Sequence, residues 1–361
     1  MESNRKIYSL QALRAIAFLG IFLAHAKIVY SWPKLGVSIF FCLSGFLMAY
    51  VYMDRDLPVG LKESFLFSVR KIKKLYLLHI ITMVAAVLIE LWIGKVNGNI
   101  LAGGYVLLRN IVLNVLLLQS WYPDSTVNVA LNGVAWYLSV ALFLYMLFPF
   151  ILRWIKKSKV AMVLAAAVII VVLQVMLSYI ALLLFHEGVQ YTWFMYCFPV
   201  FRIGDFFAGC ALFKVLGETK YVNNKSETIV YTIVEIIAFV AIIIFSVWLE
   251  KPGNGYFITA IKNWSSSYII MALVLIYLFY RCNGLLTRLF SNKLFIALGD
   301  ISPQAFLIHY VIVRFANAYM GLHQIPFTIY KTWLLFIAEF IITVVISLLY
   351  LKIKNNHRSI R

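Results

Sequence analysis

Long apolar segments alternate with short polar stretches along the whole chain. Most of these segments reach the roughly 20 residues that an α-helix needs to cross a lipid bilayer. The pattern therefore predicts an all-α, polytopic integral membrane protein. The eleven apolar segments cover residues 8–29, 36–53, 75–94, 104–120, 133–152, 160–185, 192–213, 228–249, 265–280, 294–319 and 329–351.

Basic residues gather in the loops between these segments, and their distribution indicates which segments cross the membrane. The positive-inside rule places loops rich in lysine and arginine on the cytoplasmic side. All the basic loops share that side only if segment 104–120, which carries Arg109, Asn110 and Asn114, is re-entrant or interfacial. We therefore predict about ten transmembrane helices with both termini cytoplasmic. The basic loops are residues 70–74, 153–159, 214–225, 281–293 and 352–361.

The composition also indicates a membrane protein. Hydrophobic residues make up 63% of the 361 positions and charged residues 13%, and the mean hydropathy is +0.91, outside the range of soluble globular proteins. The formal net charge is +18, but no basic domain stands apart from the apolar segments, so we expect no nucleic-acid partner. No linker or repeat divides the chain. We expect a single membrane domain over residues 1–361 that ends in a short basic cytoplasmic tail, residues 352–361.

The cysteines and histidines show no spacing typical of a disulfide framework or a metal site. The four cysteines fall in or at the ends of apolar segments, and the six histidines are scattered along the chain. We interpret the cysteines as small apolar residues. Neither disulfides nor a bound metal are expected.

The first apolar segment carries two polar side chains, Arg14 and His25. An arginine in the middle of a lipid-facing helix costs roughly 2.5 to 3.5 kcal/mol, so it should face protein or a water-filled cavity. Their separation of eleven positions along the chain corresponds to about 1100° of helical rotation and a rise of about 16.5 Å. Both side chains should therefore look into one cavity at different depths. A signal peptide cleaved after Ala26 is an alternative, although Arg14 lies directly against its short apolar run.

These two residue types can perform acyl-transfer chemistry. A neutral imidazole accepts a proton from a hydroxyl, and a guanidinium binds phosphate or carbonyl oxygens in a bidentate manner. His25 alone would favour a structural hydrogen bond to a neighbouring helix, but its pairing with Arg14 on one face favours a catalytic site. Arg202 and Asp205 have the spacing of an ion pair within a helix, for which a structural role is an equal alternative.

Five stretches of the chain carry a family resemblance. Residues 13–25 (LRAIAFLGIFLAH) place ten residues between an arginine and a histidine, and residues 36–47 (GVSIFFCLSGFL) follow. This opening resembles that of the acyltransferase-3 family of integral membrane acyltransferases. The resemblance covers nearly the whole chain in the family's order. The further similar stretches are residues 67–76 (FSVRKIKKLY), 132–140 (NGVAWYLSV) and 298–309 (LGDISPQAFLIH).

The resemblance implies a membrane O-acyltransferase that moves an acyl group, most often acetyl, from cytoplasmic acetyl-CoA to a hydroxyl of a surface polysaccharide or lipid-linked glycan. It assigns the general base to His25 and a companion role to Arg14; an acyl-imidazole intermediate is an alternative. The glutamate common in the family after its WxLSV stretch is Ala141 here, so this position cannot perform any role of that carboxylate. The expected donor-binding residues are Arg70, Lys71, Lys73 and Lys74, and the expected cavity-lining residues are Ser44, Trp136, Ser139, Arg202, Asp205, Ser302 and His309.

The resemblance also implies a multi-pass protein of the bacterial cytoplasmic membrane with membrane lipid, acyl-CoA and a glycan acceptor as partners and no tightly bound cofactor. Some family members carry an extra soluble catalytic domain. Nothing after Leu351 is long enough to fold as one, so we expect direct transfer or a separate extracytoplasmic transferase partner. Two other classes stay open: a transporter or flippase for a glycan or another anionic substrate, which also places arginines in a central cavity, and a sugar polymerase or ligase.

Overall fold

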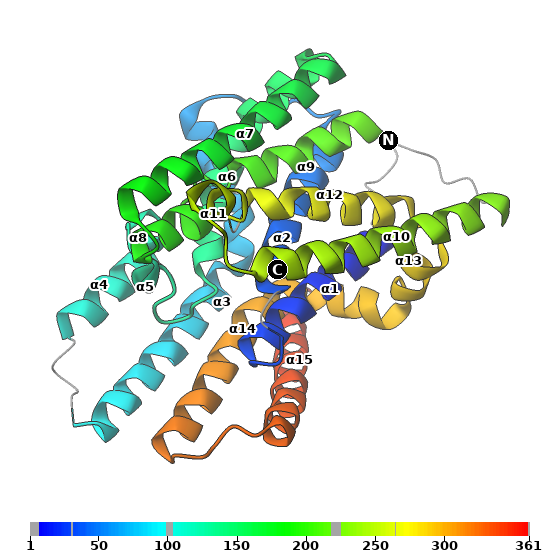
Figure 1. Cartoon of the computed structure of the whole chain (residues 1–361). Helices are drawn as coiled ribbons and strands as arrows, with labels where there is room; N and C mark the ends of the chain where they lie inside the picture. The colour runs from blue at the N-terminus through cyan, green and yellow to red at the C-terminus, as the bar shows by residue number, and fades with distance from the viewer. Residues whose placement is uncertain (1–6, 30–31, 99–103, 218–224, 264, 360–361) are drawn as a thin grey trace.

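The computed structural model describes residues 7–29, 32–98, 104–217, 225–263 and 265–359, and within these ranges it is helical without any strand (Figure 1). Long helices form one bundle, and short helical turns connect them. The helices are α1 (Tyr8–His25), α2 (Trp32–Tyr52), α3 (Leu61–Val96), α4 (Gly104–Val115), η1 (Gln119–Trp121), α5 (Ser125–Asn128), α6 (Trp136–Lys157), α7 (Val160–Phe185), α8 (Val189–Thr192), η2 (Trp193–Cys197), α9 (Ile203–Leu216), α10 (Lys225–Glu250), α11 (Tyr256–Ile261), α12 (Ser266–Arg281), α13 (Leu285–Phe290), α14 (Lys293–Leu322) and α15 (Ile329–Ser359).

Nine helical stretches in the described part of the chain are long and apolar enough to cross a membrane: α1, α2, α3, α6, α7, α10, α11 with α12, α14 and α15. They confirm the predicted all-α polytopic architecture. Helix α4 is apolar but has only 12 residues, about 18 Å, against the about 30 Å of a bilayer core. Its length agrees with the prediction that segment 104–120 does not cross.

The prediction of one unbroken crossing over residues 192–213 is wrong. The chain forms the π-helical turn η2, becomes extended at Phe198 and resumes a helix only at Ile203. Pro199 explains the break, because proline disfavours a helical conformation in the residue before it and has no N–H to donate. Helix α9 has 14 residues, about 21 Å, and is shorter than a full crossing.

The basic stretch 70–74, predicted as a loop, lies instead inside helix α3. This helix has 36 residues, about 54 Å in length, and so it extends well beyond a bilayer core of about 30 Å. No proline interrupts the stretch, and lysine, arginine and leucine are good helix formers. The predicted basic tail likewise continues α15 as far as Ser359, while residues 360 and 361 lie outside the described residues.

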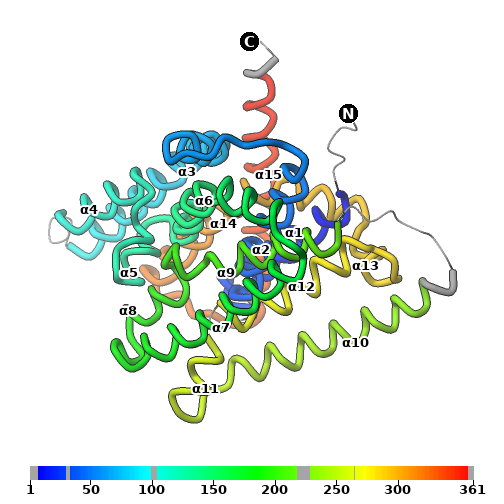
Figure 2. Tube along the Cα trace, turned by 90° about the horizontal axis from the view of Figure 1, so that it is seen from above, coloured from blue at the N-terminus to red at the C-terminus, as the bar shows by residue number. Residues whose placement is uncertain are grey.

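Helices α1 and α2 lie in the interior of the bundle, whereas α10 runs along its outer edge (Figure 2). Helix α1 packs against both α2 and α14, and α2 also packs against α9. The facing side chains form the main core; Leu13, Phe18 and Phe41 are examples of fully buried members. Helices α7, α10 and α15 expose many large apolar side chains, as expected of helices that face lipid.

Two glycines let these central helices approach one another closely. A methyl group at Gly209 of α9 would meet the backbone of Cys42 on α2, and one at Gly299 of α14 would meet the backbone of Gln11 on α1. Small residues permit such close backbone contacts in membrane bundles. The Gly299 contact holds α14 against α1 and brings the late stretch 298–309 beside the first helix.

Candidate active site

A cavity of about 420 Å³ lies among helices α1, α2, α3, α6 and α14. Its wall contains three cationic side chains, Arg14 from α1 and Lys71 and Lys74 from α3. None of the described residues in the wall is acidic, so the cavity is electropositive. Its volume falls within the about 300–1,000 Å³ typical of small-molecule sites.

Two of the cations in the cavity wall form hydrogen bonds to uncharged side chains. Arg14 donates from Nη1 to Oε1 of Gln11, one turn earlier on the same helix, at 3.3 Å. Lys71 Nζ donates to the hydroxyl of Tyr52 at 2.6 Å and lies 4.6 Å from the centre of the Tyr52 ring. Among the described carboxylates, none forms an ion pair with Arg14, Lys71 or Lys74. An anionic ligand can therefore find three positive charges there, although the carboxylate of Asp300 on α14 also acts electrostatically on Arg14.

The structure separates the four predicted donor-binding cations into two pairs. Lys71 and Lys74 are three residues apart, share one face of α3 and line the cavity. Arg70 and Lys73 are exposed and do not line it. The helical conformation of this stretch, which was predicted as a loop, explains the division.

Hydroxyl groups form the rest of the polar wall. Ser44 and Ser302, both predicted to line the cavity, are in the wall. Ser44 Oγ and Tyr145 OH lie in a hydrogen bond at 2.8 Å, and Ser302 Oγ donates to the carbonyl of Gly299 at 2.8 Å. Tyr145 was not among the predicted site residues. Its signal in the sequence is the repeat of tyrosine at positions 137 and 145, two turns apart on α6.

His25 ends helix α1 and lies outside the wall of the cavity. Its Nδ1 lies 2.9 Å from Nε2 of His309 on α14, and the two rings stack with centroids 5.2 Å apart. The edge of the Tyr310 ring contacts His25 at a centroid distance of 5.0 Å. His309 is fully buried and His25 is half-buried. The structure thus brings together two predicted site residues that are 284 positions apart.

Three aromatic side chains line the cavity, and one of them reaches the histidine pair. Phe40, Tyr137 and Phe306 all line the cavity, and their ring centroids lie 5.7 to 6.2 Å from one another. Phe306 also lies 5.8 Å from the ring of His309. We call these three residues the aromatic layer. Contrary to the expectation of one shared cavity, Arg14 and the aromatic layer line the described cavity, whereas His25 and His309 do not.

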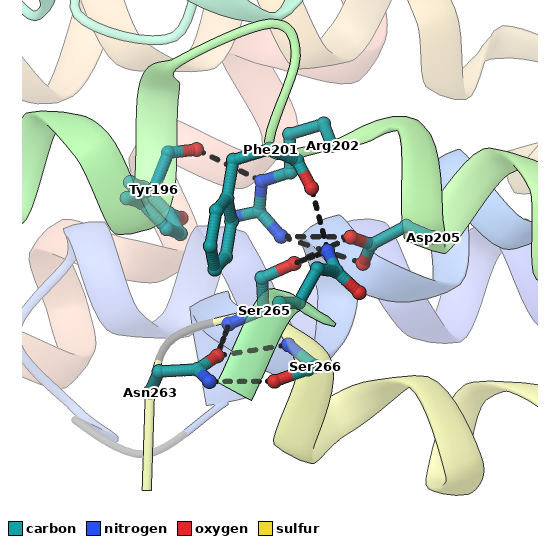
Figure 3. Close-up of polar contacts among 8 residues, drawn as sticks. Tyr196, Phe201, Arg202, Asp205, Asn263, Ser265 and Ser266 are labelled. Atoms are coloured by element: carbon teal, nitrogen blue, oxygen red, sulfur yellow. Dashed lines mark hydrogen bonds and ion pairs between the residues drawn. The ribbon is translucent and has the colours of Figure 1, made fainter. Parts of the chain in front are cut away.

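Arg202 and Asp205 form a buried network away from the cavity (Figure 3). Arg202 donates from Nε to the carbonyl of Tyr196 at 2.9 Å, and its Nη1 lies 3.4 Å from Oδ1 of Asp205. Ser265 Oγ donates to Oδ2 of Asp205 at 2.5 Å. Asn263 Oδ1 in turn accepts from the backbone N–H of Ser265 at 2.9 Å. The network connects the break before α9 to the start of α12.

The remaining predicted residues, Trp136 and Ser139, also lie outside the cavity wall. The Trp136 ring lies 5.9 Å from the Arg202 guanidinium, within cation–π range. Ser139 Oγ donates to the carbonyl of Leu117 at 2.6 Å. Both residues contact connecting segments of the bundle and help to fix them against α6.

The described side chains favour an anionic organic ligand over a metal. In the part of the chain that the structure describes, no group of three or more histidine, cysteine, aspartate or glutamate side chains is placed to hold a metal ion. The cationic cavity offers instead a guanidinium, two ammonium groups and several hydroxyls. Such groups suit phosphate and carbonyl oxygens.

Comparison with known sequences gives one family and several relatives. The family model described as an acyltransferase domain (Acyl_transf_3) matches residues 7–352. Acyltransferase MdmB of Streptomyces mycarofaciens is 28% identical over 298 residues, which are 80% of this chain and 70% of that protein. No solved structure matches the chain.

The other relatives come from Staphylococcus aureus. In the strains COL and MSSA476, proteins that carry the name "Putative O-acetyltransferase" are each 23% identical over 351 residues, or 91% of this chain. The chain spans 54% of the length of these staphylococcal proteins. The similarity therefore covers about half of each of them.

Proposed function

The chain belongs to the acyltransferase-3 family, whose model matches residues 7–352, and on this premise we propose that it is a membrane O-acyltransferase. It transfers an acyl group, acetyl in the first place, from acyl-CoA to a hydroxyl of a surface polysaccharide or a lipid-linked glycan. The observation that carries the proposal is the arrangement along α1. Arg14 lines the cationic cavity, and His25 follows on the same helix after a rise of about 16.5 Å.

The cavity supplies the donor site. The phosphate groups of acyl-CoA are anionic, and Arg14 can bind them in a bidentate manner while Lys71 and Lys74 act as point charges. The cavity end of α1 faces the cytoplasm in this proposal, because the basic first half of α3 lies there and the positive-inside rule applies. The donor therefore enters from the side on which acyl-CoA is made.

The thioester must reach His25 past the aromatic layer. The nucleotide part of acyl-CoA stays with the cations, and the narrow pantetheine arm passes between the rings of Phe40, Tyr137 and Phe306. The passage requires side-chain rotations of these three aromatic residues. The layer otherwise keeps cytoplasmic water away from the histidine pair.

His25 performs the proton transfer. Its imidazole accepts the proton of the acceptor hydroxyl as the oxygen attacks the thioester carbonyl carbon. The new C–O bond forms, the C–S bond breaks, and the departing CoA thiolate takes up the proton from His25. General base catalysis of this kind contributes about 10²- to 10⁴-fold.

The test is release of CoA thiol from acetyl-CoA by the detergent-purified chain, with glucose as the probe hydroxyl. We expect His25→Ala to abolish release at an unchanged protein yield. His323→Ala, in an exposed histidine at the end of α14, is the matched control and should retain full activity. Wild-type activity of His25→Ala would contradict the proposal. In cells, a gain of one acyl mass on envelope glycan, present with the wild-type chain and absent with His25→Ala, would identify the product and exclude a transporter.

A further inference from the structure

The partner of His25 is itself held in one orientation. His309 Nδ1 lies 3.2 Å from the backbone carbonyl oxygen of Ala305, one turn earlier on α14. On its other side, His309 Nε2 faces Nδ1 of His25 at 2.9 Å. The three groups form a continuous chain from a backbone carbonyl, through one imidazole, to the other.

This chain determines where the hydrogens lie. A carbonyl oxygen only accepts hydrogen bonds, so Nδ1 of His309 carries the hydrogen and donates it to Ala305. In a neutral imidazole the second nitrogen is then an acceptor, and Nε2 of His309 offers its lone pair to His25. Nδ1 of His25 must consequently be the donor of the 2.9 Å bond. The Nε2 atom of His25 is left with a free lone pair.

We propose that His309 is the positioning residue of this acyltransferase, which fixes His25 as the Nδ1–H tautomer and leaves its Nε2 as the base. The inference rests on the proposed function, since it needs His25 to be that base. It does not rest on the family resemblance, which gives His309 no such task. The backbone carbonyl of Ala305, which accepts the hydrogen of His309 Nδ1, sets the tautomers of both histidines.

The surroundings of His309 suit a rigid, neutral partner. Its side chain is fully buried, and the rings of Phe18 and Phe22 on α1 lie 5.5 and 5.0 Å away by centroid. Asn132 donates from Nδ2 to the backbone carbonyl of Leu307 at 2.9 Å and so fixes this part of α14. A desolvated hydrogen bond in such a site is stronger than one in water.

The same bond serves the reaction step. When His25 takes the hydroxyl proton at Nε2, it becomes an imidazolium whose Nδ1–H still donates to His309. The bond is then charge-assisted and therefore about twice as strong as a neutral one. The proton leaves again from Nε2 to the CoA thiolate, and His309 gains and loses no proton in the cycle.

Two substitutions separate this role from packing. His309→Phe keeps an aromatic ring against Phe18 and Phe22 but removes the acceptor, whereas His309→Gln loses the ring but places an amide oxygen near the former Nε2. We expect His309→Phe to lower kcat by about 10- to 100-fold, the range seen when the hydrogen-bond partner of a metal-binding histidine is removed. We expect His309→Gln to recover most of that loss. KM for acetyl-CoA should stay unchanged in both variants, because the donor cations lie in the separate cavity.

His79 provides the matched control. It is also fully buried, and its Nε2 lies 3.0 Å from the backbone oxygen of Asn114, away from the site. His79→Phe and His79→Gln should both retain the wild-type kcat. Wild-type kcat in His309→Phe, or equal losses in His309→Phe and His309→Gln, would overturn the inference while an inactive His25→Ala keeps the proposed function. Full activity of His25→Ala would instead contradict the proposed function itself.

Discussion

Two arginines inside the helical bundle, Arg14 and Arg202, have opposite surroundings. Arg202 is fully buried, with Asp205 beside it and the rings of Phe41, Trp136 and Tyr196 within 5.9 Å of its guanidinium. Arg14 hydrogen-bonds within its own helix and faces the cavity. A charge whose partners belong to the protein stabilises the fold, whereas a charge that faces a cavity is available to a ligand.

The location of the Arg202 network supports this distinction. It lies where the chain leaves helical conformation between η2 and α9, and irregular backbone inside a membrane protein needs polar partners. Gln174 Nε2 donates to the carbonyl of Phe201 at 2.5 Å, in the same region. The network thus satisfies the polar groups that the break at Pro199 exposes.

The largest expected effect is the loss of stability on removal of Asp205. Asp205→Ala leaves the Arg202 guanidinium buried without its counter-charge, which costs about 3–5 kcal/mol. We expect a markedly lower unfolding temperature in detergent and a reduced yield. The double variant Arg202→Met with Asp205→Leu should regain much of the loss, because a buried ion pair can be replaced by apolar residues of similar volume. A wild-type unfolding temperature in Asp205→Ala would contradict the structural role of the Arg202–Asp205 pair.

Arg14→Ala should show the opposite behaviour. No described carboxylate forms an ion pair with Arg14, so its removal leaves no paired charge behind and the unfolding temperature should change little. A hydrogen bond to a charged group is worth about 1.5–3 kcal/mol, which corresponds to a rise in KM for acetyl-CoA of about 10- to 100-fold. Arg14→Lys keeps the charge without the bidentate geometry and should fall in between. Steady-state thiol release and thermal unfolding of the same preparations measure both quantities, and destabilisation of Arg14→Ala would assign Arg14 to the fold.

The sequence predicts much of this arrangement but places both arginines at one cavity. Segment lengths and hydropathy predict the helices, and the spacing of Arg14 and His25 predicts a polar face on the first one. Arg202 contacts residues 196 and 205, and Asp205 in turn accepts a hydrogen bond from Ser265. Only Ser265 is distant in sequence, and its contact depends on how α12 packs, which no local pattern predicts.

Other features escape prediction for related reasons. The pairing of His25 with His309 depends on the contact between α1 and α14, which joins residues 284 positions apart. The positive charge of residues 70–74 predicts a loop, whereas their helix propensity favours a helix. Without the helix, the sequence does not show that Lys71 faces the cavity while Arg70 does not. Pro199, by contrast, was visible in the sequence and marks the break before α9.

A smaller effect should distinguish the lysines of the wall from their neighbours. Lys71→Ala or Lys74→Ala removes one exposed or half-exposed point charge, and such charges contribute about 0.2–1 kcal/mol. We expect KM for acetyl-CoA to rise by up to about fivefold in each, with no change in kcat. Arg70→Ala and Lys73→Ala are the matched controls on the same helix and should leave KM unchanged. Equal increases in all four variants would mean that the basic stretch acts through its overall charge and not through the cavity.

The last expected effect, similar in size to that of a single lysine, comes from salt alone, and one titration follows both KM and the unfolding temperature. Raising the ionic strength from about 0.1 M to about 1 M shortens the screening length from about 10 Å to about 3 Å, while buried pairs are screened much less. KM for acetyl-CoA should therefore rise by about two- to fivefold in the wild-type chain, in line with the modest energies of exposed charges, and by less in the Lys71→Ala, Lys74→Ala double variant. The unfolding temperature should respond weakly, because the Arg202–Asp205 pair has no exposed surface. If salt lowered the unfolding temperature but left KM constant, the result would contradict both the donor-binding role of Arg14 and the structural role of the buried Arg202–Asp205 pair.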